Sequence, residues 1–278
     1  MVIQTVREVH RMAERMGIGL HLSRRHAQPL GEAKTLHGIH VHPDEEESVR
    51  AGDITMAIGG DGTMLKAANL ARVISRPLLG INSGKLGFLA NIQRQNMKRA
   101  LEAVLSKNYE LDSRWFLQAV LSDGSTRYAL NEFVFSRTGS LSMITITAEY
   151  DGSLINRYWA DGIIVSSPTG STAYNLSTGG PIVLPQTGVM VLTPISPHTL
   201  TTRPLVLPAG KNLIIKIDPP DQEVLFSVDG KNFDLPADSP VVSIRQSDQT
   251  IDLIKLHGQS YFETLRNKLM WGMDVRGE

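Results

Sequence analysis

The sequence predicts an α/β domain followed by an all-β domain. In the first 109 residues, apolar runs typical of strands alternate with segments whose apolar residues recur at helical spacing. From about residue 110, strand-like runs follow one another directly, and Asp123-Gly124, Asp151-Gly152 and Asp229-Gly230 are typical hairpin dipeptides between them. We therefore place the domains at 1–109 and 110–256, and we expect the tail, 257–278, to return to the first domain.

The elements of the first domain follow from these patterns. Val2, Val6 and Val9 begin a helical repeat that ends before Gly17, a plausible C-terminal cap. A polar segment covers 23–52, and its acidic run at 44–47 is expected to open a solvated helix. The remaining predicted elements are strands at 18–22, 54–58 and 77–81 and helices at 64–73 and 97–107.

The second domain consists of strands, and the tail contains a helix. The expected strands are 115–121, 128–136, 143–150, 154–158, 162–165, 189–192, 213–217, 224–228, 241–245 and 250–256. Phe262, Leu265 and Leu269 give the last segment, 261–270, a helical pattern that would pack on another element.

Composition excludes several classes of protein. The chain has 28 basic and 28 acidic residues, so charge gives no sign of a nucleic-acid or membrane partner. No apolar run approaches the roughly 18–20 residues that cross a bilayer, and we see no signal-peptide pattern. The absence of cysteine excludes disulfides and thiolate chemistry, and it fits a cytoplasmic location.

The segment Gly59-Gly60-Asp61-Gly62-Thr63 joins a predicted strand to a predicted helix. Glycines allow close approach to a ligand, and a helix N-terminus favours anions. The turn therefore suits phosphate groups, with Asp61 placed to accept a proton or to bind a phosphate-bridging cation. The alternative is a tight turn in which Asp61 caps the helix.

Two further segments contain candidate ligand-binding residues. Asn131 and Glu132 interrupt a predicted buried strand, where polar groups are costly unless a ligand such as a sugar satisfies them; a solvated strand edge is the alternative. Residues 161–177 pass from a β run into a loop rich in hydroxyls, which could present them to a polar ligand.

Other features are weaker. His37, His40 and His42 lie close in sequence, but without matching ligands we interpret them as a solvated segment. The sequence has no P-loop, no G-x-G-x-x-G fingerprint and no G-x-S-x-G elbow. Nucleotides, if bound, are bound by a different route.

Taken together, the motifs resemble those of the NAD kinase family. The turn at 59–63, Asn131-Glu132 and Pro168-Thr-Gly-Ser-Thr-Ala-Tyr174 occur in the family's order, as do 80–89 and 197–207. The glycine turn alone is shared with diacylglycerol-type lipid kinases, so the combination is what is specific. The resemblance implies a Rossmann-like α/β domain and a β-sandwich-like domain.

The implied reaction moves the γ-phosphoryl of ATP, or polyphosphate in some members, to the 2′-hydroxyl of the adenosine ribose of NAD. A divalent cation, usually Mg²⁺, assists, and the metal ligands stay unassigned. Members are commonly dimers or tetramers whose sites borrow residues from a neighbour. Asp61 is the implied general base, and the implied phosphate cradle is Gly59, Gly60, Gly62 and Thr63. The implied NAD-binding residues are Asp61, Gly62, Phe88, Asn131, Glu132, Asp161, Thr169, Thr172, Ala173, Tyr174, Asn175, Leu176 and Ser177.

Three departures from the family pattern stand out. Members usually begin with a strand and a Gly-x-Pro turn, whereas here the first helix starts at about residue 2, so we expect that strand to be missing. Trp159 replaces a common basic residue, whose phosphate contact is either lost or supplied by Arg157, and Lys231 replaces a common glutamine. A lipid kinase and a non-catalytic dinucleotide-binding regulator are the alternatives.

Overall fold

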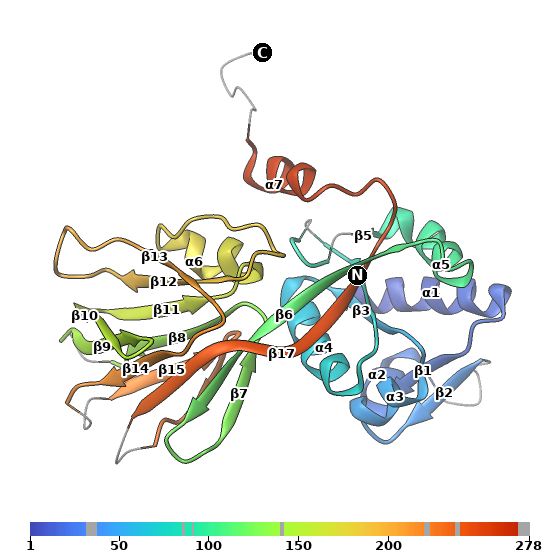
Figure 1. The fold of residues 1–278 in the computed structure, drawn as a ribbon. Helices are drawn as coiled ribbons and strands as arrows, with labels where there is room; N and C mark the ends of the chain where they lie inside the picture. Colours follow the sequence, from blue (N-terminus) through green and yellow to red (C-terminus); the bar gives the residue numbers. More distant parts are fainter. Residues whose placement is uncertain are drawn as a thin grey trace. The chain divides into compact units, whose positions relative to one another are not determined.

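The computed structural model describes residues 1–31, 38–84, 87–90, 92–139, 142–219, 223–236 and 240–271. The chain divides into two compact units, residues 1–113 with 251–278 and residues 114–250. The chain passes into the second unit within strand β6 (Glu110–Leu121) and returns within β17 (Val241–Lys255) (Figure 1). The segment after Ile251 thus belongs to the first unit.

The first unit is built on a small parallel sheet. Strand β4 lies between β3 and β5, and Leu253 near the end of β17 pairs with Leu78 of β4. Strands β1 and β2 form a separate parallel pair. The elements of this unit, besides β6 and β17, are α1 (Val2–Met16), β1 (Leu20–Ser23), α2 (Arg24–Ala27), η1 (Gln28–Leu30), β2 (Ile39–His42), α3 (Glu45–Ala51), β3 (Thr55–Gly59), α4 (Asp61–Ile74), β4 (Leu78–Asn82), β5 (Ile92–Gln93), η3 (Arg94–Asn96), α5 (Met97–Leu105) and α7 (Tyr261–Leu269).

Helices cover both faces of β4. Ile81 packs with Val9 of α1 and Met97 of α5 on one face. Because side chains alternate along a strand, Gly80 faces the other side, where the end of Met64 on α4 would lie 2.6 Å from a Cβ placed at that position. The missing side chain lets α4 approach the sheet closely. This confirms the predicted α/β architecture.

Helix ends agree with the sequence patterns. Gly17 ends α1 in the left-handed conformation, with φ of 69°. Asp44 accepts a hydrogen bond from the backbone N–H of Glu47 at 2.9 Å and so caps α3. Helix α4 begins at Asp61, three residues before the predicted start, so the glycine turn is partly the helix's own first turn.

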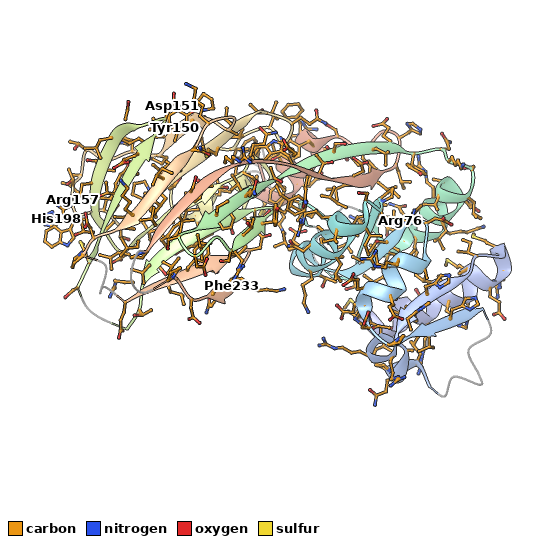
Figure 2. All side chains as sticks on the ribbon, turned by 60° about the horizontal axis from the view of Figure 1, so that its bottom comes forward. Arg76, Tyr150, Asp151, Arg157, His198 and Phe233 are labelled. Atoms are coloured by element: carbon orange, nitrogen blue, oxygen red, sulfur yellow. The ribbon has the colours of Figure 1, made fainter. Side chains whose placement is uncertain are left out.

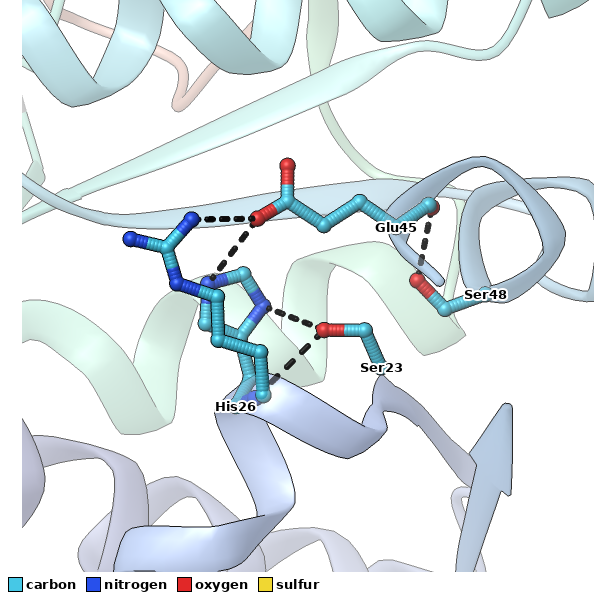
Figure 3. Close-up of polar contacts among 5 residues, drawn as sticks. Ser23, His26, Glu45 and Ser48 are labelled. Atoms are coloured by element: carbon cyan, nitrogen blue, oxygen red, sulfur yellow. Dashed lines mark hydrogen bonds and ion pairs between the residues drawn. The ribbon is translucent and has the colours of Figure 1, made fainter. Parts of the chain in front are cut away.

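Side chains link the starts of α2 and α3 (Figure 3). The Ser23 hydroxyl accepts a hydrogen bond from the backbone N–H of His26 at 3.4 Å and caps α2. The Glu45 carboxylate lies 3.8 Å from the Arg25 guanidinium and 3.5 Å from Nε2 of His26. The Ser48 hydroxyl donates to the carbonyl of Glu45 at 2.8 Å. Arg25 and His26 are largely exposed, so these ion pairs add little to stability.

The second unit contains two antiparallel layers around one core. One is a six-stranded sheet in the order β13-β12-β11-β8-β15-β16, and the other contains β10, β9, β14 and β17 in that order, with β6 and β7 paired beyond. Phe226 stacks on Phe133 and Phe135 at ring-centroid distances of 5.7 and 4.9 Å within this core. The predicted sheet-rich second domain is therefore confirmed.

The elements of the second unit, besides β6 and β17, are β7 (Thr126–Ala129), β8 (Glu132–Arg137), β9 (Ile144–Tyr150), β10 (Ser153–Ala160), β11 (Gly162–Ser166), η4 (Thr169–Thr172), α6 (Tyr174–Ser177), β12 (Val189–Ile195), β13 (Leu205–Pro208), β14 (Leu213–Ile217), β15 (Val224–Val228) and β16 (Lys231–Phe233). The three Asp-Gly dipeptides join β6 to β7, β9 to β10 and β15 to β16, as predicted.

The strand predictions were wrong in some details. The predicted strand 128–136 is broken at residues 130 and 131, because their backbone N–H groups bond to the Asp229 side chain instead of to a neighbouring strand. The predicted strands 241–245 and 250–256 are one strand, β17, although a polar stretch separates their apolar parts. Strands β2, β5, β13 and β16 were not predicted. No helix among the described residues is long and apolar enough to cross a membrane.

Candidate functional site

In the first unit, the Asp61 carboxylate gathers three successive backbone N–H groups. Its Oδ2 accepts from Phe88 at 2.9 Å, and its Oδ1 accepts from Leu89 at 3.0 Å and Ala90 at 3.1 Å. Asp61 is the first residue of α4, whose N-cap is Gly60, so its side chain does not cap the helix. An ionised carboxylate has about four acceptor positions, and three are used here. Among the described residues, nothing uses the fourth position, which a ligand could occupy.

Two glycines allow this arrangement. A Cβ on Gly87 would lie 2.1 Å from Oδ1 of Asp61, and a Cβ on Gly59 would lie 2.3 Å from the hydroxyl of Thr63. Both contacts are shorter than atoms can approach, so neither position has room for a side chain. The packing explains why these two positions are glycine.

A buried asparagine supports the same turn. Asn82, 3% exposed at the end of β4, donates to the carbonyl of Ala90 at 3.1 Å and accepts from the N–H of Gly84 at 2.7 Å. The N–H of Ser83 bonds to the carbonyl of Gly59 at 3.2 Å. Gly60, Gly62 and Thr63 are exposed beside this scaffold, and Phe88 is half-buried. The first unit thus offers a rigid acid next to an accessible helix N-terminus.

In the second unit, Asp229 repeats the arrangement. Its Oδ1 accepts from the backbone N–H groups of Asn131 at 2.8 Å and Glu132 at 3.1 Å, and its Oδ2 accepts from Leu130 at 2.8 Å. The N–H of Asp229 bonds in turn to the carbonyl of Glu132 at 3.1 Å. These four bonds fix the backbone at the start of β8, where both predicted ligand residues lie.

Glu132 is buried without full hydrogen bonding. Its side chain is 7% exposed, and its Oε2 has no partner among the described residues. Burial, together with the nearby Asp229 charge, raises the pKa of Glu132 to about 8, while a hydrogen bond from the Tyr174 N–H lowers it. A buried carboxyl group held in this way is a candidate ligand-binding group.

The hydroxyl-rich loop packs against Asn131. The carbonyl of Asn131 accepts from the N–H of Ser167 at 2.8 Å, and a Cβ on Gly170 would lie 2.2 Å from that oxygen. The contact fixes 3₁₀ helix η4 and short helix α6 beside β8. Ala173, Thr172 and Leu176 are half-buried, while Tyr174 and Ser177 are exposed and can reach a ligand.

Two predicted ligand residues are buried inside this loop. Thr169 is 7% exposed, and its hydroxyl accepts from the Arg114 guanidinium at 3.2 Å. Asn175 is fully buried: its amide donates to the carbonyls of Ser171 and Pro181, both at 3.1 Å, and accepts from the Thr193 hydroxyl at 2.6 Å. These three hydrogen bonds show that the Asn175 side chain stabilises the loop from inside.

Asp161 lies away from the other predicted residues of the second unit. It precedes β11, whereas Ser166 at the far end of that strand pairs with Glu132. A strand rises about 3.3 Å per residue, so Asp161 lies about 16 Å from Ser166. Its Oδ1 accepts from Nε of Arg137 at 2.7 Å. Within one chain, the fold does not bring Asp161 beside Glu132.

The structure shows the surroundings of Trp159, Arg157 and Lys231, the residues named in two of the three departures. Trp159, 52% exposed, lies against His198 with ring centroids 4.4 Å apart and the ring planes tilted by 35°. Arg157 lies 3.7 Å from the Asp218 carboxylate, and Lys231 pairs with Val228 in the β15–β16 hairpin. The side chains of Arg157 and His198 lie at the same end of the second unit (Figure 2).

The histidines form a cluster that sequence spacing only partly indicated. Nδ1 of His21 lies 2.9 Å from Nε2 of His42, and the His21 ring stacks on His40 at 4.9 Å. His37 lies outside the described residues. Within the part of the chain that the structure describes, no group of three or more His, Asp or Glu side chains could hold a metal ion.

Comparison with known proteins decides the family. Residues 5–109 match the family described as ATP-NAD kinase N-terminal domain, and residues 130–256 match ATP-NAD kinase C-terminal domain. The chain belongs to the NAD kinase family. An NAD kinase of Cytophaga hutchinsonii is 39% identical over 81% of this chain and 77% of that protein. An NAD kinase of Flavobacterium psychrophilum is 38% identical over 88% of this chain and 83% of that protein.

Solved structures show the same fold as this NAD kinase family member. Yeast NADH kinase complexed with NADH superposes with a TM-score of 0.87 at 24% identity, covering 100% of this chain and 86% of that one. An NAD kinase from Archaeoglobus fulgidus in complex with ATP gives 0.74 at 23% identity, covering 94% of each chain. The expected resemblance and fold class are thereby confirmed.

Sequence reasoning missed the residues that build the site. Asp229 was interpreted only as part of a hairpin dipeptide, and Asn82 and Gly87 were given no separate role. Asn82 carried a usable signal, since it is a polar residue that ends an apolar strand. The part of Asp229 depends on a contact between residues about a hundred positions apart, which no local pattern shows.

Proposed function

We propose that this chain is an NAD kinase that transfers the γ-phosphoryl group of ATP to the 2′-hydroxyl of the adenosine ribose of NAD. The single observation that best supports this is the Asp61 arrangement: a carboxylate oriented by three N–H groups, with one acceptor position left, beside an exposed helix N-terminus. Phosphoryl transfer depends mainly on positioning and charge, and this turn offers both.

Each residue group has a part in the proposed reaction. The exposed Gly60, Gly62 and Thr63 at the start of α4 would bind donor phosphates through backbone N–H groups. Asp61 would orient the hydroxyl and accept its proton. Asn131 and Glu132 would hold the ribose, whose hydroxyls would give the unpaired Oε2 of Glu132 a partner.

A magnesium ion fits the site only together with the substrates. Magnesium is usually bound through one or two carboxylates plus substrate phosphates and water. The last acceptor position of Asp61 would be used by the ribose hydroxyl, and no protein cluster of three ligands was found among the described residues. The donor phosphates would therefore supply most of its ligands, and the ion would neutralise their charge.

The position of Asp161 supports an oligomer in this proposal. Asp161 is expected to bind the nicotinamide end of NAD, yet it lies about 16 Å along β11 from Ser166. A second copy of the chain would supply it, in a dimer or tetramer. Mixing inactive Asp61→Asn with inactive Asp161→Ala should then restore part of the activity. A mixture no more active than the sum of the two variants would contradict a shared site.

A cytoplasmic location stays a prediction.

One assay tests the function directly. The protein is incubated with NAD, magnesium and ATP, or with polyphosphate in place of ATP, and NADP is detected with an NADP-specific dehydrogenase. Asp61→Asn should lower kcat by about 10²–10⁴-fold, the usual range for a positioned base. Asp53→Asn, an exposed aspartate before β3, is the matched control. NAD binding without NADP formation by the wild type would contradict the proposal.

A further inference from the structure

Asp229 has contacts that a simple hairpin turn does not need. In the β9–β10 hairpin, Asp151 has φ of 51° and its carboxylate pairs with Lys211. In the β15–β16 hairpin, Asp229 has φ of 47°, and its carboxylate instead holds three N–H groups of another segment, 130–132. Both turns have two successive residues with positive φ, as type I′ turns do, so the turn itself does not require the second set of bonds.

We propose that Asp229 is a positioning residue for dinucleotide binding, acting by clamping the backbone at 130–132 and by placing its negative charge beside the Glu132 side chain. This inference rests on the proposed function, because it assumes that Asn131 and Glu132 bind the ribose. It adds a residue outside the predicted set, on a hairpin distant in sequence.

The clamp controls where the ligand groups point. The N–H groups of Leu130, Asn131 and Glu132 all end on one carboxylate, and the N–H of Asp229 returns to the carbonyl of Glu132. Together these four bonds leave the start of β8 little freedom. Because side chains follow their backbone, a shift of the clamp would move the Asn131 amide and the Glu132 carboxyl together.

The Asp229 charge contributes to the raised pKa of Glu132. Burial is the larger cause of its raised pKa, and repulsion from Asp229 is the second. A hydrogen bond from the Tyr174 N–H on α6 lowers the pKa of Glu132. Of the basic residues on other elements of this unit, Arg114 of β6 binds Thr169, and Lys231 of β16 is exposed. Strand β11 carries no ionisable side chain. An ionised Glu132 accepts hydroxyl hydrogens from the ribose, so NAD binding should improve as pH rises through its pKa.

The test measures the dissociation constant of NAD by calorimetry between pH 6 and 9, for the wild type and Asp229→Asn. The amide keeps one acceptor oxygen and removes the charge. At high pH we expect the dissociation constant of NAD to be about 10-fold higher in Asp229→Asn, as for a lost charged hydrogen bond. We also expect the midpoint of its pH dependence to lie at lower pH than in the wild type. A purely structural role would leave the midpoint unchanged.

Controls separate the clamp from general stability. Asp151→Asn changes the equivalent residue of the β9–β10 turn. This turn lies far from Phe233 of β16, which belongs to the hairpin that carries Asp229 (Figure 2). The variant should therefore keep the NAD affinity and the pH midpoint of the wild type. In a protein that already carries Glu132→Gln, NAD binding should have no Glu132 titration, so Asp229→Asn cannot shift its midpoint. Asp229→Asn should also weaken NAD binding less there than in the wild type. If Asp229→Asn does not fold, Asp229→Ser, which keeps a hydroxyl acceptor without charge, replaces it.

The outcomes are distinguishable. An unshifted midpoint in Asp229→Asn, or an equal loss of affinity with and without Glu132, overturns the part given to Asp229 while leaving the kinase activity intact. A wild-type protein that binds no NAD and forms no NADP overturns the proposed function instead.

Discussion

Gly87 has no room for a side chain because Asp61 occupies the space. A Cβ at this position would lie 2.1 Å from Oδ1 of Asp61, and the same carboxylate binds the three N–H groups that follow at 88–90. The glycine and the carboxylate are therefore one structural unit. The acid is held by the loop, and the loop is held by the acid.

Gly87→Ala should therefore impair catalysis through Asp61. The added methyl must push the carboxylate or the 87–90 segment aside, and a misplacement of about 1 Å at a reacting group can lower the rate by about 10²-fold. We expect kcat to fall by about 10- to 100-fold, measured as NADP formation.

Gly84→Ala is the matched control for this change. A Cβ at Gly84 meets nothing within 4 Å, so its kcat should stay close to that of the wild type. Equal activity of the two variants would show that the close contact with Asp61 does not matter.

Glu132 should make the free protein less stable as pH rises. Its pKa is about 8 in the fold against an ordinary value of 4.5, so between these values the folded state holds a proton that the unfolded state has lost. Stability therefore falls through this window as pH rises. Each unit of difference corresponds to about 1.4 kcal/mol, so the total is a few kcal/mol.

Glu132→Gln removes this titration. We expect its free energy of unfolding, measured with urea, to exceed that of the wild type increasingly from pH 5 to pH 8. Glu102→Gln on the exposed face of α5 should show no such trend. A constant difference between Glu132→Gln and the wild type across this range would contradict the raised pKa.

The sequence predicted the architecture well because that information is local. Periodicity and turn dipeptides located α1, β3, β4, α5 and the three hairpins, since each depends on residues close in sequence. The break after Ala129 could not be predicted in this way. It depends on Asp229, which is about a hundred residues away in the chain.

The candidate residues were predicted by motif, but their individual parts were not. Asp61 and Glu132 were chosen for their residue type, whereas the fold shows what holds each of them. Asn175 was grouped with the ligand residues because it lies among hydroxyls in the sequence. Only its burial and its three hydrogen bonds show that the side chain faces inward.

Asn175→Ala should destabilise the second unit. It leaves the buried Thr193 hydroxyl and the carbonyls of Ser171 and Pro181 without their partner, and an unsatisfied buried group costs about 1–3 kcal/mol. We expect a loss of about 3 kcal/mol in urea unfolding, together with weaker NAD binding. Ser177→Ala, at an exposed position of α6, should leave stability unchanged. Equal stabilities would contradict the inward role.

Gly170→Ala and Gly80→Ala test whether close packing against backbone is worse than packing against a flexible side chain. A Cβ on Gly170 would lie 2.2 Å from the carbonyl oxygen of Asn131 and 2.5 Å from its carbon, and neither can move without shifting β8. A Cβ on Gly80 would lie 2.6 Å from the terminal atoms of Met64, which can change rotamer. It would also lie 3.3 Å from the Cα of Ala90, a tight contact that a shift of a few tenths of an ångström relieves.

Overpacking costs about 1–3 kcal/mol in typical cores. Gly80→Ala should fall in that range, while Gly170→Ala should exceed it and also abolish NAD binding, because the displaced backbone belongs to Asn131. Unfolding in urea ranks the two variants, and the reverse order would mean that the loop at 167–170 can move away from β8 without loss.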